Sequence, residues 1–376
     1  MSEPARRKLL FYTHALAGGG AERVWSLLAS GFARRGHDVI MAVDYEAKDN
    51  LAFIDRNVRI EVLGGPHALN VTRLAKLIRS EKPDVTLSAL CVSNLKHAAA
   101  AALAGRQKRA ILSYHGFFES EPQALSRTSY LLTPLLSRFT GGTVAVSDSL
   151  AQDLATRFLS QRKRTRRIYN PAIWGDANAH LTEADLKARP PVVVACGRLS
   201  EDKDFISLIR AFAKVEPHDA RLVIVGEGAA RAALQAEIDR LGLAGRVVLV
   251  GYAPEPWNYY AQASCLAVSS KLESFGMVVV EALGHGLPVV STDCKGPREI
   301  LADGRFGRLV PVGDTAKMAG AISAALADPG DPAPRMARAQ DFSLNRALDA
   351  YGAMIDEVAA VPSRRASVSK LLAPIG

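Results

Sequence analysis

Short, continuously apolar runs alternate with amphipathic segments along the whole chain. Such runs are typical of strands that are buried on both faces of a parallel sheet. The predicted strands are 8–14, 37–43, 84–90, 109–115, 142–147, 192–197, 220–226, 246–251, 265–270 and 287–292. Between them, apolar residues recur at helical spacing, as Val24, Leu28 and Phe32 do in the segment 20–36. This alternation predicts an α/β protein built from βαβ units.

The series of strands is interrupted once, and the 376 residues are enough for two domains. Charged residues, an Asn-Pro step and polar residues end the first series, and a new one starts at Val192. We therefore predict two doubly wound, Rossmann-like domains, 1–170 and 171–349, joined near 168–190. Ligands of such sheets bind beyond the carboxyl ends of the strands, so both sets of strand-end loops should face an interdomain cleft. Residues 350–376 are expected to be peripheral and able to pack back on the first domain.

The composition, with 48% apolar and 23% charged residues, is typical of a globular protein. The four cysteines are scattered without metal-binding or redox spacing, which indicates reduced thiols inside a cell. No signal peptide and no apolar run of membrane-spanning length is found. The chain is therefore expected to be cytoplasmic and not to cross a bilayer.

Positive charge is concentrated in the first predicted domain. Residues 1–170 carry 25 lysines and arginines against 14 aspartates and glutamates, whereas the remainder carries 22 against 24. This asymmetry indicates that the first domain faces something anionic. Because no nucleic-acid-binding motif accompanies the charge, anionic membrane headgroups are favoured over nucleic acid.

The segment 124–139 combines basic residues with apolar residues at helical spacing. The apolar positions are Leu125, Leu132, Leu136 and Phe139. Core packing is the favoured interpretation of these side chains. The alternative is an interfacial helix that contacts anionic lipid, supported by the basic run at 162–167.

Two cations follow the predicted strand 192–197. Arg198 and Lys203 lie in the loop before a helix, where free backbone N–H groups also favour an anion, so together they suit a pyrophosphate. The residues Asp202-Lys203-Asp204 also spell D-x-D, a metal-binding signature in some nucleotide-sugar enzymes. The central lysine would compete with a cation and Asp204 suits a helix N-cap, so no metal site is predicted.

Two glutamates flank an apolar run in "ESFGMVVVE". Glu273 is expected in a loop and Glu281 in the second turn of the following helix. A carboxylate accepts two hydrogen bonds and suits the paired hydroxyls of a sugar, and Gly276 permits close approach by a ligand. Gly226 and Gly228 form only part of a dinucleotide-binding fingerprint, a weak signal by itself.

Taken together, these motifs resemble the retaining GT-B glycosyltransferases of family 4, over nearly the whole chain. The resemblance is closest to members that build lipid-linked or cell-surface polysaccharide. It is carried by "GGGAERV" (18–24), "VAVSDSLAQDL" (144–154), "GRLSEDKDF" (197–205), "VGEG" (225–228), "ESFGMVVVEALGHGLPVV" (273–290) and "GPREIL" (296–301).

The resemblance implies a role for each matching residue. Arg198 and Lys203 are implied to neutralise the donor diphosphate, Glu281 to bind the donor ribose, and Glu273 to contact the transferred sugar. His115, in "SYHG", is implied to lie at the reacting centre, and it forms the catalytic set with Arg198, Lys203 and Glu273. The other implied donor-binding residues are Gly18, Gly19, Gly20, Gly226, Glu227, Gly228, Ser274, Phe275, Gly276 and Met277.

The resemblance further implies a transferase (EC 2.4) that moves a hexose or N-acetylhexosamine from a nucleotide sugar, without a metal or other cofactor. UDP is the favoured nucleotide, and the expected acceptor is lipid-linked, glycolipid or polysaccharide, at the inner face of the cell membrane. The alternatives are a GDP-mannose-dependent mannosyltransferase and a GT-B epimerase. A Rossmann oxidoreductase would leave the two glutamates unexplained. Asp204 and His285 depart from the residues usual in the family, and Asp204 affects the phosphate loop.

Overall fold

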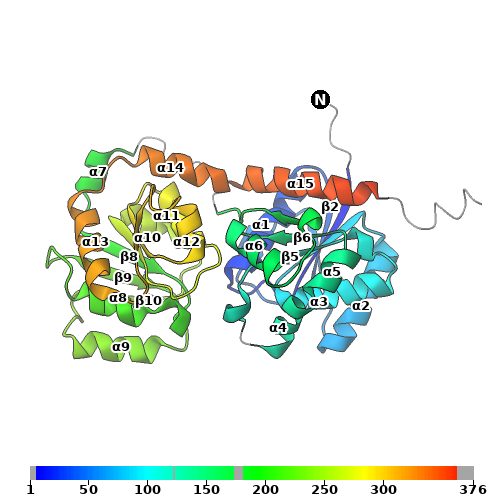
Figure 1. Ribbon diagram of the computed structural model, residues 1–376, viewed down its shortest axis with the longest axis horizontal. Coiled ribbons are helices and arrows are strands. Elements are labelled where there is room, and N and C mark those ends of the chain that lie inside the picture. Colours follow the sequence, from blue (N-terminus) through cyan, green and yellow to red (C-terminus); the bar gives the residue numbers. More distant parts are fainter. Residues whose placement is uncertain (1–5, 122, 173–180, 362–376) are drawn as a thin grey trace, which may run out of the picture.

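Two parallel sheets, each covered by helices on both faces, make up the computed structural model (Figure 1), which describes residues 6–121, 123–172 and 181–361. The predicted fold class, two doubly wound α/β domains, is confirmed. Part of the predicted junction, 173–180, and the tail 362–376 lie outside the described residues. No helix in the described ranges is both long enough and apolar enough to cross a bilayer.

The first sheet has seven strands in the order β3-β2-β1-β4-β5-β6-β7, and every adjacent pair is parallel. The strands are β1 (Lys8–Thr13), β2 (Asp38–Val43), β3 (Val58–Val62), β4 (Val85–Ala89), β5 (Ala110–Tyr114), β6 (Gly142–Ala145) and β7 (Thr165–Arg167). Its helices are α1 (Gly20–Arg34), α2 (His67–Glu81), α3 (Cys91–Leu103), α4 (Ala124–Leu131), α5 (Thr133–Phe139) and α6 (Asp148–Thr156). The chain winds outward from β1 in both directions, which places a topological switch point beside β1.

The second sheet has six parallel strands in the order β10-β9-β8-β11-β12-β13. The strands are β8 (Val192–Cys196), β9 (Arg221–Val225), β10 (Val247–Gly251), β11 (Cys265–Val268), β12 (Val289–Thr292) and β13 (Arg308–Val310). Its helices are α7 (Glu183–Lys187), α8 (Phe205–Phe212), α9 (Arg231–Arg240), α10 (Trp257–Gln262), α11 (Met277–Gly284), α12 (Lys295–Ile300), α13 (Thr315–Ala327) and α14 (Ala333–Ala339). Strands β8 and β11 mark its switch point.

The last helix, α15 (Leu344–Ala360), returns to the first domain and lies along α1 (Figure 1). Leu348 fits against Gly31 so closely that a Cβ on this glycine would lie 2.6 Å from a leucine methyl carbon. Ion pairs such as Arg166–Glu357, at 2.5 Å, flank the apolar contact. The core of the first domain therefore includes side chains from both ends of the described chain.

The two domains meet at their strand-end loops and where the chain crosses between them. At the crossing, the Ala172 N–H donates to the Phe342 carbonyl at 3.1 Å, and Tyr169 packs between Phe342 and Phe275. Beside it, the carboxylate of Glu299 in α12 accepts hydrogen bonds from the backbone of the first turn of α6. The two sheets thus have their strand-end loops in contact at the domain junction.

Candidate active site

A close cation–carboxylate pair lies at the carboxyl edge of the second sheet. Lys203, in the short turn after β8, donates to the Glu273 carboxylate at 2.5 Å, and both side chains are largely buried, at 23% and 17% exposure. Burial opposes the charged form of Lys203, but the adjacent carboxylate outweighs it and raises the pKa of Lys203 above its ordinary value. Arg198, from the same loop, is exposed, and among the described residues no carboxylate forms an ion pair with it.

The loop 273–276 joins β11 to α11 and brings Glu273 and Glu281 to one edge. Gly276 is the N-cap of α11 and has a φ of +106°, a backbone conformation that residues other than glycine rarely adopt. Phe275 is buried, and its backbone lies so close to Gly296 that a Cβ there would be 2.3 Å from the Phe275 carbonyl oxygen. The loop is therefore held rigidly by the start of α12, with Ser274 and Met277 on the side of the first domain.

Glu281 is buried in α11 and has a partner on each carboxylate oxygen. The Tyr260 hydroxyl donates to Oε2 at 2.8 Å, and Arg23, from α1 of the first domain, reaches Oε1 at 3.4 Å. Burial raises the pKa of Glu281, while the charge of Arg23 lowers it. Neither Arg23 nor Tyr260 was expected at the site.

The predicted glycine loop faces the 273–277 loop across the cleft. A Cβ on Gly20 would lie 3.8 Å from Met277 Cγ, and one on Gly18 would lie 3.4 Å from the hydroxyl of Tyr252, after β10. A Cβ on Gly19 would collide with the carboxylate of Glu22, which folds back over the loop. The glycine loop therefore lies close to residues of the second domain at Gly18 and Gly20.

His115 lies at the carboxyl end of β5, as its sequence position predicts. Its Nε2 is 3.0 Å from the Ser113 hydroxyl, its ring packs edge-on against Trp25, and its Nδ1 is buried without a partner among the described residues. Burial lowers the pKa of His115 to about 3, so the imidazole is neutral at ordinary pH. The Ser274 hydroxyl donates to the His115 carbonyl at 2.6 Å, which ties the two domains together beside this ring.

Gly226 and Gly228 serve close packing of two strand-end loops. A Cβ on Gly226 would lie 1.8 Å from the Gly197 carbonyl oxygen, and one on Gly228 would lie 2.3 Å from that of Leu199. Glu227 between them is exposed and pairs with Arg231. These glycines hold the Arg198 loop in place by backbone contact, which accounts for them without a ligand.

In the D-x-D stretch, Asp204 caps a helix. Asp204 adopts a left-handed conformation and accepts a hydrogen bond from Ser207 N at 3.4 Å, the N-cap of α8 that the sequence predicts. Within the described ranges, no group of three or more His, Cys, Asp or Glu side chains has an arrangement that could hold a metal ion.

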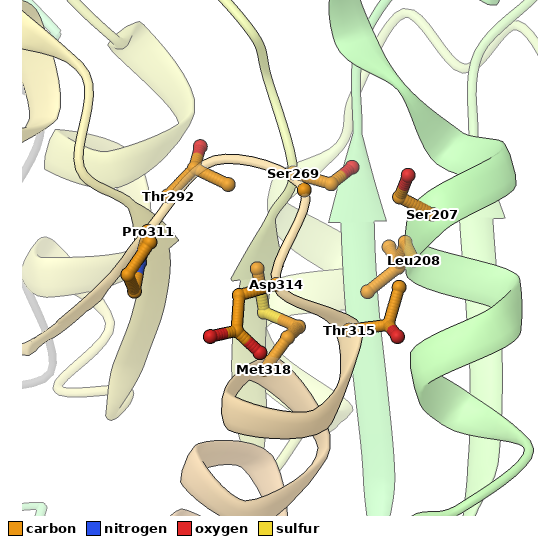
Figure 2. A pocket seen from close by; sticks show the side chains of 9 residues that line it. Ser207, Leu208, Ser269, Thr292, Pro311, Asp314, Thr315 and Met318 are labelled. Atoms are coloured by element: carbon orange, nitrogen blue, oxygen red, sulfur yellow. The ribbon is translucent and has the colours of Figure 1, made fainter.

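A separate hollow opens between α8 and α13 (Figure 2). It is lined by Ser207, Leu208, Ser269, Thr292, Pro311, Gly313, Asp314, Thr315 and Met318. Asp314 caps α13 through the N–H of Lys317, and the Ser269 hydroxyl donates to the Lys203 carbonyl at 2.7 Å. The hollow therefore adjoins the Lys203 turn but includes none of the predicted site residues.

Two doubly wound domains whose strand-end loops face each other form the architecture of the GT-B fold. Two family models match the chain: Glycosyltransferase Family 4 over residues 18–172 and Glycosyl transferases group 1 over residues 178–341. The chain belongs to this family of glycosyltransferases (EC 2.4), and the family predicted from the motifs is confirmed.

The similar proteins include glycosyltransferases that are named for glycan biosynthesis. The lipopolysaccharide core biosynthesis glycosyltransferase LpsE of Rhizobium meliloti is 28% identical over 82% of this chain and 86% of its own length. The N-acetylgalactosamine-N,N'-diacetylbacillosaminyl-diphospho-undecaprenol 4-alpha-N-acetylgalactosaminyltransferase of Campylobacter jejuni is 33% identical over 47% of this chain. The match spans only about half of that relative, 48% of its length.

Solved structures share the fold over almost the entire chain. Anabaena HepE in complex with UDP-glucose has a TM-score of 0.79 at 22% identity and covers 95% of this chain and 100% of its own. The lipopolysaccharide outer core galactosyltransferase WaaB has a TM-score of 0.72 at 19% identity, covering 93% and 99%. The predicted GT-B fold is confirmed.

Proposed function

We propose that this glycosyltransferase moves a hexose or N-acetylhexosamine from a UDP-sugar to a lipid-linked or glycan acceptor, with retention at the anomeric carbon. The observation that carries the proposal is the convergence of Arg198, Lys203, Glu273 and Glu281 at one sheet edge, opposite the glycine loop 18–20. Cations there suit a diphosphate, and carboxylates suit the hydroxyls of ribose and sugar.

The proposed reaction breaks the bond between the anomeric carbon and the diphosphate oxygen. Negative charge develops on the diphosphate, where Arg198 and Lys203 stabilise it. The acceptor hydroxyl attacks from the same face, forms the new glycosidic bond and gives its proton to a diphosphate oxygen. Because burial lowers the pKa of His115 to about 3, we expect its imidazole to take part in the site as a neutral hydrogen-bonding group and not as a cation.

A donor panel tests the choice of nucleotide. HepE structures contain UDP or UDP-glucose, which favours UDP, whereas one relative is a GDP-mannose-dependent mannosyltransferase. We expect UDP and UDP-sugars to raise the melting temperature more than GDP-mannose does, and NAD to leave it unchanged. A larger shift with GDP-mannose would contradict the assignment of UDP. Release of UDP only when an acceptor is present would separate transfer from epimerisation.

The proposed acceptor requires access to a membrane, and an exposed apolar stripe on α4 and α5 supports this. Leu131, Leu135 and Phe139 follow one another at four-residue spacing, with exposures of 66%, 51% and 54%, and Leu159 is exposed by 65%. The favoured interpretation of this segment as core is wrong for Leu125, Leu132 and Phe139, which are exposed, although Leu136 packs partly against the core. We name Leu131, Leu135, Phe139 and Leu159 the apolar stripe.

Basic side chains surround the apolar stripe. Arg138 lies on α5, Lys108 stacks over the Phe139 ring, and exposed Arg162 and Lys163 follow Leu159. The segments are adjacent because the Gln161 N–H donates to the Ser137 hydroxyl at 3.0 Å. No acidic residue occurs in 123–147 or 154–169. Apolar side chains ringed by cations fit the interface of an anionic bilayer, so we propose peripheral attachment to the inner face of the cell membrane.

Vesicle flotation tests the attachment. We expect the protein to float with vesicles containing anionic phospholipid and to float several-fold less after Leu131→Ser and Leu135→Ser together. The matched control is Val248→Ser with Val250→Ser, which changes two similarly exposed apolar residues on the edge strand β10 of the second domain. Equal flotation of the two double variants, or equal binding to neutral and anionic vesicles, would refute the proposal.

A further inference from the structure

We propose that Arg23 is a positioning residue that holds Glu281 as a charged, oriented carboxylate, so that the ribose site is complete only when both domains contribute to it. The inference rests on the proposed function of Glu281 as the ribose ligand. It adds that donor binding by the second domain depends on a side chain of the first. Donor affinity is thereby linked to the closed arrangement of the cleft.

Among the described residues, Arg23 and Tyr260 leave part of the hydrogen-bond acceptor capacity of Glu281 unused. A carboxylate has about four lone-pair positions. Tyr260 occupies one on Oε2 and Arg23 one on Oε1, which fixes the plane of the carboxylate. The remaining positions can accept the 2′- and 3′-hydroxyls of a ribose. Arg23 is thus placed to orient the carboxylate without displacing the ribose.

Aromatic side chains from both domains fix the guanidinium of Arg23. Its central carbon lies 5.3 Å from the centre of the Phe53 ring, and Phe53 packs edge-on against Trp257 at the start of α10, with ring centres 6.3 Å apart. Trp257 and Glu281 both belong to the second domain. The Arg23 side chain, 15% exposed, is therefore enclosed between the two domains and oriented toward Glu281.

Without Arg23, the surroundings of Glu281 favour its neutral form. Burial raises the pKa of Glu281, and the opposing charges come from Arg23 first and His285 second. The other groups that face the carboxylate are the Tyr260 hydroxyl and, behind it, the Cys196 thiol, both neutral because burial raises the pKa of each. Loss of Arg23 thus leaves a carboxyl that is protonated more readily and accepts fewer hydrogen bonds from a ribose.

The test compares UDP with 2′,3′-dideoxy-UDP by titration calorimetry between pH 6.5 and 8.5. In the unaltered protein, we expect UDP to bind about tenfold or more tighter at every pH, because hydrogen bonds to a charged group are lost in the dideoxy probe. In Arg23→Gln, this ratio should fall several-fold at pH 6.5 and recover as pH rises and Glu281 ionises.

Two further variants distinguish the geometry of the Arg23 side chain from its charge, and both from a general effect on folding. Arg23→Lys should retain an intermediate ratio, because a cation remains beside Glu281. The matched control Arg34→Gln removes an arginine at the exposed end of the same helix and should leave the ratio unchanged.

Two different results would overturn two different claims. If Arg23→Gln keeps the full ratio at all pH values, Arg23 does not position Glu281. If the unaltered protein binds UDP and the dideoxy probe equally, or binds neither, the proposed role of Glu281 in the function is itself wrong.

Discussion

Replacing Lys203 with alanine removes the cation closest to Glu273 and tests the proposed diphosphate site directly. The two side chains are 2.5 Å apart at the carboxyl edge of the second sheet, and the ammonium is fully charged because Glu273 raises the pKa of Lys203 against the effect of burial. The variant therefore loses one positive charge where the leaving group acquires negative charge, and it leaves Glu273 without its partner.

The structure sets the expected size of both effects. A group aimed at developing charge contributes about 2.7–4 kcal/mol, so turnover should fall by about 10² to 10³-fold. Both side chains of the ion pair are less than a quarter exposed, so the pair is intermediate between a surface pair and a buried pair. Surface pairs contribute at most about 1 kcal/mol, and disruption of a buried pair costs about 3–5 kcal/mol. We expect a loss of about 2 kcal/mol in the free energy of unfolding, which leaves the protein folded.

The assay is the rate of UDP release from a UDP-sugar, measured together with the Kd of UDP and a thermal melt. Lys271→Ala is the matched control, because Lys271 lies close in sequence to Glu273 but is exposed and pairs with Glu201 at 3.4 Å. The control should retain nearly normal turnover. Lys203→Arg should recover part of the lost rate. Near-normal turnover in folded Lys203→Ala would refute the assignment of the phosphate site.

Three further outcomes are expected. Gly226→Ala should cost about 3 kcal/mol in the free energy of unfolding, measured by denaturant titration. The reason is that its Cβ would lie 1.8 Å from the Gly197 carbonyl oxygen and that its φ is +148°. The control Gly320→Ala, in open space on a helix, should stabilise the protein slightly in the same titration. Glu299→Ala should cost about 1 kcal/mol because the N–H groups of Asp148 and Ser149 at the start of α6 lose their acceptor, and an unchanged melt would contradict this contact. Burial lowers the pKa of His97 to about 3, so only the unfolded state gains its proton below pH 6.5. Because of this residue, the free energy of unfolding should decrease by about 1 kcal/mol as the pH is lowered from 6 to 5. The decrease should be smaller in His97→Asn.

The fold was predictable because buried strands can be recognised from their apolar sequences. The segments Val192–Cys196 and Cys265–Val268 are continuously apolar, and they form the strands β8 and β11, flanked by helices. A local capping signal was also correct, because Asp204 caps α8 as predicted. These features depend on neighbours in the sequence, so a single chain is enough to recognise them.

The site was only partly predictable because half of it is made by contacts between distant residues. Arg23 and Glu281 are 258 positions apart, and nothing in the local pattern around Arg23 distinguishes it from a solvated helix residue. The interpretation of 124–139 as core was wrong for a different reason. Helical spacing of leucines identifies the apolar face of a helix but does not show whether another element covers that face. The roles of Arg198, Lys203, Glu273 and His115 stay predictions until the variants are measured.

The return of α15 to the first domain has a consequence for biosynthesis. Leu348, Tyr351 and Met354 complete the same apolar core as Phe11 and Trp25, near the opposite end of the chain. Domains commonly fold in order as they emerge from the ribosome. Here the core of the domain translated first stays partly uncovered until α15, the last of the described helices, has also emerged.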